Sequence, residues 1–158
     1  MRAFFITACV LSLIYTVVAF ALVQEVESAR NRAFDEYLYN SLSYDDDYNS
    51  YSSYSYADQY EDEADGYTIT AGIISVLYMI ISVVVFLLAL LRVKTKTMKV
   101  IAIIGLSLSG LFMLWAFLPM ASPSAVSFNE IGPAFILAGL ALLAFHIVGM
   151  IQAFRVKA

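Results

Sequence analysis

The sequence predicts an all-α integral membrane protein, a four-helix transmembrane bundle of up-down topology with an acidic, tyrosine-rich outer loop. Three observations support this fold class: 61% of the 158 residues are hydrophobic, the mean hydropathy is +0.79, and four stretches of about 20 residues carry no charge. Continuous apolar stretches of about 18 residues or more are typical of membrane helices, which satisfy their own backbone hydrogen bonds in lipid. Strands of a membrane barrel would alternate apolar and polar residues over about ten positions.

The order of elements follows from where the uncharged stretches begin and end. We expect transmembrane helix 1 at 1–23, a helical extension at 24–40, an acidic Tyr/Ser/Asp-rich flexible segment at 41–67, transmembrane helix 2 at 68–91, a basic loop at 92–99, transmembrane helix 3 at 100–118, an outer loop at 119–132, transmembrane helix 4 at 133–154 and a tail at 155–158. At about 1.5 Å of rise per residue, each predicted helix is long enough to cross about 30 Å of hydrocarbon.

The first stretch has a second interpretation, as a cleaved signal peptide. Arg2, the apolar run and the Ala19-Phe20-Ala21 triplet resemble a leader with a small-x-small cleavage site. The run is longer than the about 7–15 apolar residues of an ordinary leader, which favours a retained helix. Cleavage would leave three transmembrane helices in the same orientation.

The charged residues predict the orientation of the bundle. The segment 24–67 holds twelve carboxylates against Arg30 and Arg32. In contrast, every charged residue at the two termini and in the 92–99 loop is basic: Arg2, Arg92, Lys94, Lys96, Lys99, Arg155 and Lys157. Because Lys and Arg in short loops mark the cytoplasmic side, we expect cytoplasmic termini, residues 24–67 outside, and residence in the cell or plasma membrane.

The outer segment 24–67 changes character near residue 40. From Met1 to Asp65 there is no glycine or proline, and apolar residues recur every three to four positions at Val26, Ala29, Ala33, Phe34, Tyr37 and Leu38. This pattern predicts that helix 1 continues beyond the membrane. Residues 41–66 contain Leu42 as their only aliphatic side chain larger than alanine. Such a composition buries too little apolar area to offset the entropy of ordering, so we expect flexibility until a partner orders it.

Small residues and prolines in the last two predicted helices indicate how they pack. Gly105 and Ser109, like Ala134 and Ala138, form small-xxx-small pairs that let membrane helices approach closely, and we expect them to serve internal packing. Pro119 and Pro133 border the predicted outer loop, with Pro133 in the first turn of helix 4.

His146 is the only Asp, Glu, Lys, Arg or His inside the four apolar stretches 3–23, 68–91, 100–118 and 133–154. An intramembrane imidazole is consistent with a proton-sensing or ligand-contacting site, because its pKa is ordinarily near neutrality. Since no carboxylate or basic side chain lies in the helices to relay a proton, we favour a neutral, structural imidazole. Its hydrogen-bond partners would be hydroxyls on other helices, namely Tyr15, Tyr78, Ser75, Ser82, Ser107 and Ser109.

The residue inventory argues against catalysis and against a bound cofactor or metal. With His146 and Cys9 as the only histidine and cysteine, no His/Cys metal cluster forms, and no Gly-rich phosphate loop or nucleophile elbow is present. Asp45, Asp47 and Asn49 match the first, third and fifth positions of a calcium loop, but Ser50 and Tyr56 replace its glycine and final glutamate. We therefore expect no enzyme, cofactor or nucleic acid, and only weak cation attraction by the outer loop.

The tyrosine-acid segment is the remaining candidate for function. Tyrosine offers a large amphipathic contact area at low entropic cost and, next to carboxylates, suits a basic surface. We expect a small multi-pass scaffold or accessory subunit of a larger membrane complex, which contacts another membrane protein through Tyr44, Asp45, Asp46, Asp47, Tyr48, Tyr51, Tyr54, Tyr56 and Tyr60. The alternatives are a small channel or transporter component with a cation-attracting loop, and a solubilising tether without a specific partner.

Overall fold

The computed structural model is all-helical and describes residues 2–42, 50–93, 95–121 and 128–155. Its elements are α1 (Arg2–Leu42), α2 (Ser50–Arg92), α3 (Lys96–Ala121) and α4 (Phe128–Arg155). All four are long and apolar enough to cross a membrane. The prediction of four long apolar helices is therefore confirmed.

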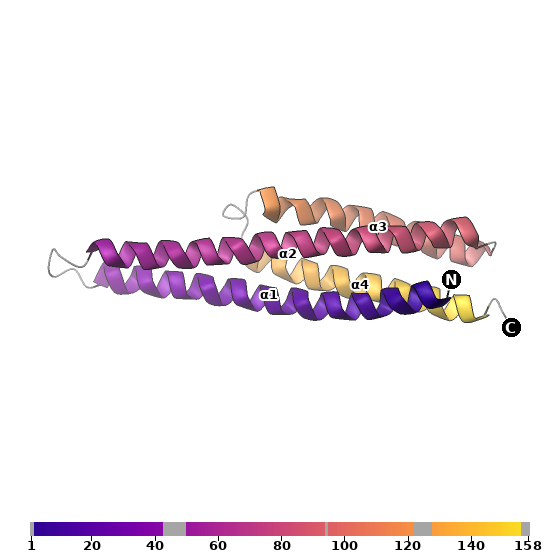
Figure 1. The fold of residues 1–158 in the computed structure, drawn as a ribbon, viewed down its shortest axis with the longest axis horizontal. Coiled ribbons are helices and arrows are strands. Elements are labelled where there is room, and N and C mark those ends of the chain that lie inside the picture. Colours follow the sequence, from indigo (N-terminus) through magenta and orange to yellow (C-terminus); the bar gives the residue numbers. More distant parts are fainter. Residues whose placement is uncertain (1, 43–49, 94, 122–127, 156–158) are drawn as a thin grey trace.

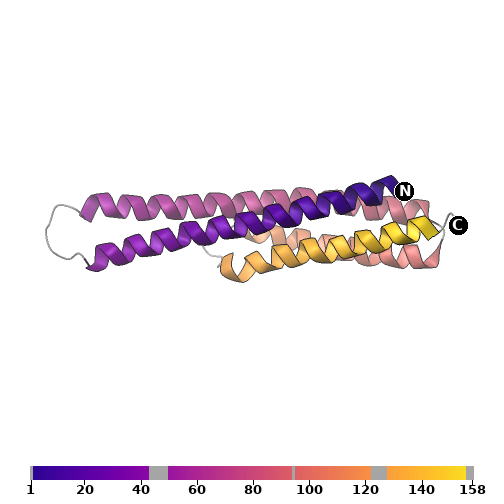
Figure 2. The ribbon, with the colours of Figure 1, turned by 90° about the horizontal axis from the view of Figure 1, so that it is seen from below.

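The four helices run alternately up and down, so both termini and the α2–α3 turn lie at one end (Figures 1 and 2). α1 packs against α2 and α4, and α2 packs against α3, whereas α3 and α4 contact each other much less. α3 and α4 are shorter and cover only the part of α1 and α2 near the termini (Figure 1). We call this part the bundle, and we call the projecting pair, residues 27–42 of α1 and 50–67 of α2, the arm.

A seven-residue repeat keeps α1 and α2 paired along both the bundle and the arm. The buried positions of α1 alternate spacings of three and four residues, with one gap at the half-buried Leu22: Phe5, Ala8, Ser12, Tyr15, Ala19, Val26, Ala29 and Ala33. The buried positions of α2 repeat every seven residues in two sets: Ala57, Ala64, Ala71, Tyr78 and Val85, with Thr68, Ser75, Ser82 and Ala89. Such a repeat keeps one seam of a helix facing its partner over many turns.

The segment 41–67, expected to be flexible, differs from that expectation over residues 50–67, which form the first turns of α2. The physical reason is that α1 supplies a partner surface within the same chain. Ala57 and Ala64 are 0% and 1% exposed against it, so two small side chains at seven-residue spacing are enough to form the seam. Residues 43–49 lie outside the described residues.

The predicted outer loop 119–132 is shorter in the structure, because α3 continues to Ala121 and α4 begins at Phe128. Pro119 and Pro133 consequently lie inside helices, each near the outer end of its helix. A proline removes one backbone hydrogen bond and clashes with the preceding turn. That cost is smallest close to a helix end, where few turns depend on the missing bond.

Glycines set the closest approaches between helices in the bundle. A Cβ on Gly105 would collide with the Phe86 ring of α2, and one on Gly139 would lie 2.6 Å from Thr16 Oγ1 and 2.9 Å from a Tyr15 ring carbon. A different contact joins the ends of α1 and α4 near the termini. The Arg2 guanidinium lies over the Phe154 ring, 4.5 Å from its centroid, and donates a hydrogen bond to the Phe154 carbonyl oxygen. A cation at the last carbonyls of α4 satisfies groups that a helix end leaves open.

Candidate functional site

A cluster of five polar side chains is buried inside the bundle and joins three helices. Its members are Ser12 and Tyr15 of α1, Ser75 and Tyr78 of α2, and His146 of α4. The Ser12 hydroxyl lies 2.7 Å from the Tyr78 hydroxyl and 2.9 Å from His146 Nδ1. The Tyr15 hydroxyl lies 2.9 Å from Ser75 Oγ, and the two tyrosine rings stack with their centroids 4.1 Å apart. The cluster therefore fixes the relative heights of α1, α2 and α4.

The hydrogen bonds of Ser12 determine the tautomer of His146. Ser12 Oγ also lies 2.8 Å from the Ala8 carbonyl oxygen, to which only Ser12 can donate. A serine hydroxyl has one hydrogen and two lone pairs, so Ser12 accepts from both the Tyr78 hydroxyl and His146 Nδ1–H. His146 is thereby assigned as the Nδ1–H tautomer, an assignment that rests on geometry. Its Nε2 is buried without a hydrogen-bond partner among the described residues, and its ring stacks on Phe86 at 4.8 Å.

The Ser12–His146 pair has the composition of a nucleophile and its base, but not the accessibility. Both side chains are 0% exposed. The Ser12 proton points to the Ala8 carbonyl rather than to the imidazole, whereas an activated serine needs the reverse arrangement. The arrangement supports helix packing and provides no approach for a substrate.

Sequence reasoning named four members of this cluster, including Ser75, and missed Ser12 at its centre. Tyr15, Tyr78 and His146 lie together, and Tyr78 reaches the imidazole through Ser12 rather than directly. Ser109, another expected partner, instead donates to the Gly105 carbonyl oxygen of its own helix. The signal that identifies Ser12 is its position in the seven-residue repeat, between Ala8 and Tyr15, on the seam that faces α2.

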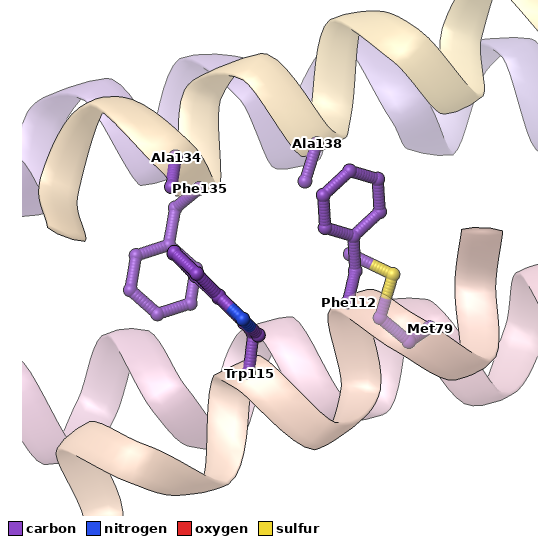
Figure 3. A pocket seen from close by; sticks show the side chains of 6 residues that line it. All are labelled: Met79, Phe112, Trp115, Ala134, Phe135 and Ala138. Atoms are coloured by element: carbon purple, nitrogen blue, oxygen red, sulfur yellow. The ribbon is translucent and has the colours of Figure 1, made fainter.

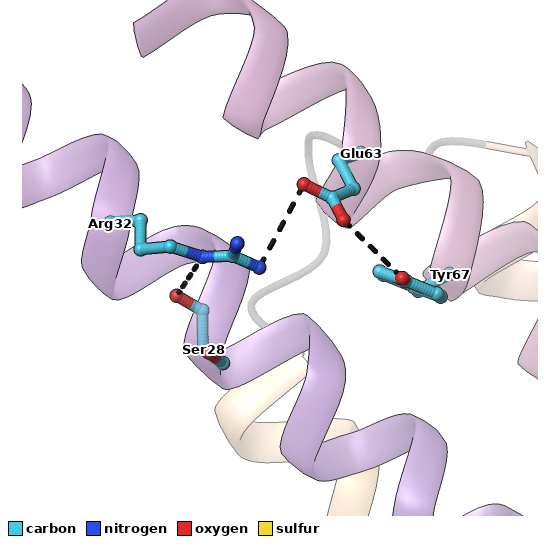
Figure 4. Close-up of polar contacts among 4 residues, drawn as sticks. All are labelled: Ser28, Arg32, Glu63 and Tyr67. Atoms are coloured by element: carbon cyan, nitrogen blue, oxygen red, sulfur yellow. Dashed lines mark hydrogen bonds and ion pairs between the residues drawn. The ribbon is translucent and has the colours of Figure 1, made fainter. Parts of the chain in front are cut away.

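The arm is held by small apolar contacts inside and by polar contacts across its surface. Arg32 Nη2 lies 3.8 Å from Glu63 Oε2, and the same arginine donates through Nε to the Ser28 carbonyl (Figure 4). The Tyr67 hydroxyl donates to Glu63 Oε1 at 3.3 Å (Figure 4). The charge of Glu63 and this hydrogen bond raise the pKa of the half-buried Tyr67. Arg32 therefore bridges the two helices of the arm.

The predicted partner-binding residues fall into three groups. Tyr44, Asp45, Asp46, Asp47 and Tyr48 lie outside the described residues, and for Tyr51 and Tyr54 the structure describes only their place in α2. The side chain of Tyr56 is 55% exposed on the arm. Tyr60 is half-buried beneath Arg32, whose guanidinium carbon lies 5.2 Å from the ring centroid. Of these two described side chains, Tyr56 is thus exposed on the surface of the arm, and Tyr60 contacts Arg32 across it.

Exposed apolar residues on the arm are an additional surface that the sequence interpretation did not separate from the seam. Phe34 and Leu38, grouped there with Val26, Ala29 and Ala33, are 62% and 43% exposed, whereas those three are buried. Tyr39 on the same helix is 71% exposed. α1 therefore presents one face to α2 and leaves large apolar and aromatic side chains exposed elsewhere on its surface.

A small crevice lies between α3 and α4 on the outer half of the bundle. Phe112 and Trp115 of α3, Ala134, Phe135 and Ala138 of α4, and Met79 of α2 line it (Figure 3). Ala134 and Ala138, expected to bring helices close together, are among the residues that line this crevice, and Ala138 is buried. Only the Trp115 indole among these six side chains can donate a hydrogen bond, so the lining of the crevice is mostly apolar.

Within the part of the chain that the structure describes, no three His, Cys, Asp or Glu side chains are placed to share a metal ion. Searches of protein-family models, curated proteins and solved structures find no match to this chain.

Proposed function

We propose that this chain is an integral membrane protein that acts as a scaffold or accessory subunit of a larger membrane complex, with its arm contacting a partner outside the membrane. The arm is the observation that supports this proposal. α1 and α2 continue past α3 and α4 by about 16–18 residues, which is about 25 Å of helix. A continuous helix pair carries a recognition surface away from the lipid at a fixed angle to the bundle.

The surfaces of the two parts support the membrane placement. The bundle exposes large apolar side chains on all four helices. Examples are Val17, Leu77, Leu114 and Leu137, which are 57–69% exposed. Lipid is the solvent that suits such a surface, since water disfavours it. Most of the basic residues lie in the segments at the end that carries the termini, which supports a cytoplasmic location for this end and an outer location for the arm.

The alternative of a small channel or transporter component receives less support from the bundle. Its centre contains the stacked Tyr15 and Tyr78 rings and the fully buried Ser12 and His146. A conducting path needs polar groups that line an opening. The acidic arm would concentrate cations equally well in either function, so its charge does not discriminate between them.

The proposal is tested by removing the arm from the full-length protein in its own membrane. Replacing residues 27–67 with a short Gly/Ser turn is expected to reduce co-purifying membrane proteins at least tenfold, with the bundle still helical. A matched pair separates charge from shape: Asp35→Asn with Asp58→Asn and Asp62→Asn should weaken the association, whereas Asp→Glu at the same positions should preserve it. An unchanged set of co-purifying proteins after arm removal contradicts the proposal.

The membrane orientation has its own test. With Cys9 replaced by serine, a single cysteine at Ser28 should react with a membrane-impermeant maleimide added to intact cells, and one at Lys96 should react only after permeabilisation. The reverse labelling pattern would place the arm in the cytoplasm.

A further inference from the structure

α1 carries a second seven-residue repeat on its outward face, separate from the seam that packs on α2. Along the bundle it consists of exposed apolar residues, and along the arm it resumes with Phe34 and Leu38. Its positions alternate spacings of three and four residues: Val10, Leu13, Val17, Phe20, Gln24, Glu27, Asn31, Phe34 and Leu38. The six apolar members are 43–68% exposed. We call these nine positions the outer stripe.

Contact with lipid explains the exposed apolar residues of the outer stripe from Val10 to Phe20, but not those at Phe34 and Leu38. Phe34 lies eleven residues beyond Val23, the end of the first uncharged stretch, which is about 16 Å further along the helix. At that height, α2 covers only the opposite seam, where Ala29 and Ala33 are 0% and 3% exposed. A phenylalanine that is 62% exposed in water, in the same register as the lipid-facing residues, indicates a surface that another helix covers.

We propose that the outer stripe docks one transmembrane helix of another membrane protein, and that this helix continues outward as a basic amphipathic helix alongside the arm. This inference rests on the proposed function and names the chemistry of the partner. The register supports one continuous helix, because the same two positions of the repeat face outward from Val10 to Leu38. A partner that bound the arm alone would not require the repeat to continue in phase through the bundle.

Charge decides between a basic partner and a second copy of this chain. Within residues 24–39 and 56–67, nine carboxylates stand against Arg30 and Arg32, and Arg32 is already paired with Glu63. Glu27 lies within the outer stripe, and Asp35 lies beside Phe34. Two copies packed along this face would bring carboxylates together, which is unfavourable, whereas lysines or arginines flanking an apolar seam would pair with them.

The partner helix therefore has a definite pattern. Apolar residues at three- and four-residue spacing cover Val10 to Phe20 within the lipid, and a shorter apolar set covers Phe34 and Leu38 outside it. Basic residues occupy the intervening level of Glu27 and flank the outer set beside Asp35. Gln24 and Asn31 offer amide groups that hydrogen-bond polar side chains where the partner leaves the lipid.

Photocross-linking in native membranes tests the inference at two heights. Benzoylphenylalanine replaces Val17 at the level of the bundle or Asn31 on the arm, both on the outer stripe. Matched controls place the probe on other exposed faces, at Leu77 of α2 and at Tyr39 of α1, which are 57% and 71% exposed. The cross-linked peptides are identified by mass spectrometry.

The expected result is one polypeptide cross-linked from both stripe positions, in its transmembrane segment from Val17 and in an adjoining Lys/Arg-containing segment from Asn31. The combined change Phe34→Ser with Leu38→Ser should lower the Asn31 adduct at least tenfold while the helical content is unchanged. Adducts to two different polypeptides, to an acidic segment, to a second copy of this chain, or undiminished in the double variant would overturn the inference.

The two proposals fail in distinguishable ways. If arm removal releases the partner but its adducts come from Tyr39 or Leu77 rather than from the outer stripe, the docking face is wrong and the proposed function stands. If arm removal releases nothing, both proposals fail.

Discussion

The bundle and the arm are built from the same two long helices, yet different side chains hold them together. In the bundle, large residues such as Phe5, Met79, Phe86 and Leu142 are fully buried, and five polar groups are bonded across three helices. In the arm, the buried side chains that the structure describes on the seam past Val26 are alanines, and an ionic contact lies on its exposed surface. Burying an alanine removes far less apolar area than burying a phenylalanine, so the arm gains much less from its own packing.

This difference indicates that the bundle determines the position of the arm. An isolated pair of helices with an alanine seam would be marginal in water, because short helices depend on tertiary packing. Both helices of the arm continue helices that the bundle already holds in register. They are therefore extended from formed helices and do not need to be nucleated in the arm. The arm surface is then free to carry charges and exposed aromatics that a self-sufficient domain of this size would have to bury.

The largest expected effect comes from filling a close approach in the bundle. Gly105→Ala should destabilise the whole protein by about 1–3 kcal/mol, because its Cβ collides with the buried Phe86 ring. Gly110→Ala on the same helix is the control, since nothing lies within 4 Å of its Cβ. Unfolding of the purified protein in mixed micelles measures both variants. Equal stability of the two would mean that α2 and α3 do not approach as described.

The second effect distinguishes the centre of the polar cluster from its edge. Ser12→Ala removes the acceptor for Tyr78 O–H and for His146 Nδ1–H, and leaving buried donors unpaired should cost about 1–3 kcal/mol. His146→Phe loses one hydrogen bond of about 0.6 kcal/mol in an apolar bundle, but it also removes the unpaired Nε2. We therefore expect it to cost less than about 1 kcal/mol. A larger loss of stability from His146→Phe than from Ser12→Ala would contradict the assigned tautomer.

The third effect is confined to the arm. Ala29→Leu adds three carbons to a seam position with no exposed surface, which should separate the two helices there. Amide hydrogen exchange in residues 27–42 and 56–67 is expected to become about tenfold faster, with exchange in the bundle unchanged. Asn31→Leu places the same leucine side chain on the exposed outward face and should leave arm exchange as it was. If exchange in the bundle also accelerates, the two regions do not open independently.

Sequence reasoning reached the fold because its main determinants are local. Continuous apolar stretches predict the four helices, and the absence of breakers before Asp65 predicts the extension of helix 1. Residues 50–65 also lack glycine and proline, but their Ser/Tyr/Asp composition favours the opposite prediction, a flexible segment. Ala57 and Ala64 are in phase with Ala71 and Tyr78. This phase becomes informative only when α1 is recognised as the partner.

The candidate site was harder to predict, because it depends on which helix faces which. His146 stood out as the only histidine, and Tyr15 and Tyr78 as large polar residues in apolar surroundings. Ser12 looks like any other hydroxyl in a membrane helix until α1, α2 and α4 are set in register. The two faces of α1 were likewise merged, because a three-to-four-residue spacing fits both Ala33 on the seam and Phe34 on the outer stripe.

The smallest expected effect is a change in titration at the junction of the two regions. The negative charge of Glu63 disfavours the Tyr67 phenolate, and its carboxylate accepts a hydrogen bond from the neutral hydroxyl, so the pKa of Tyr67 is raised above its ordinary value of 10.0. The neutral form is favoured in the folded arm. The contribution of this contact is therefore complete below pH 10 and is lost as the pH rises through the raised pKa.

Ultraviolet difference titration of the wild type against Tyr67→Phe isolates this one tyrosine. Glu63→Gln should return its pKa towards 10.0, while Asp58→Asn, beside Tyr37, should leave it raised. An unchanged Tyr67 titration in Glu63→Gln would mean that the two side chains are not neighbours in solution, and that the arm is looser than its alanine seam and the Arg32 bridge imply.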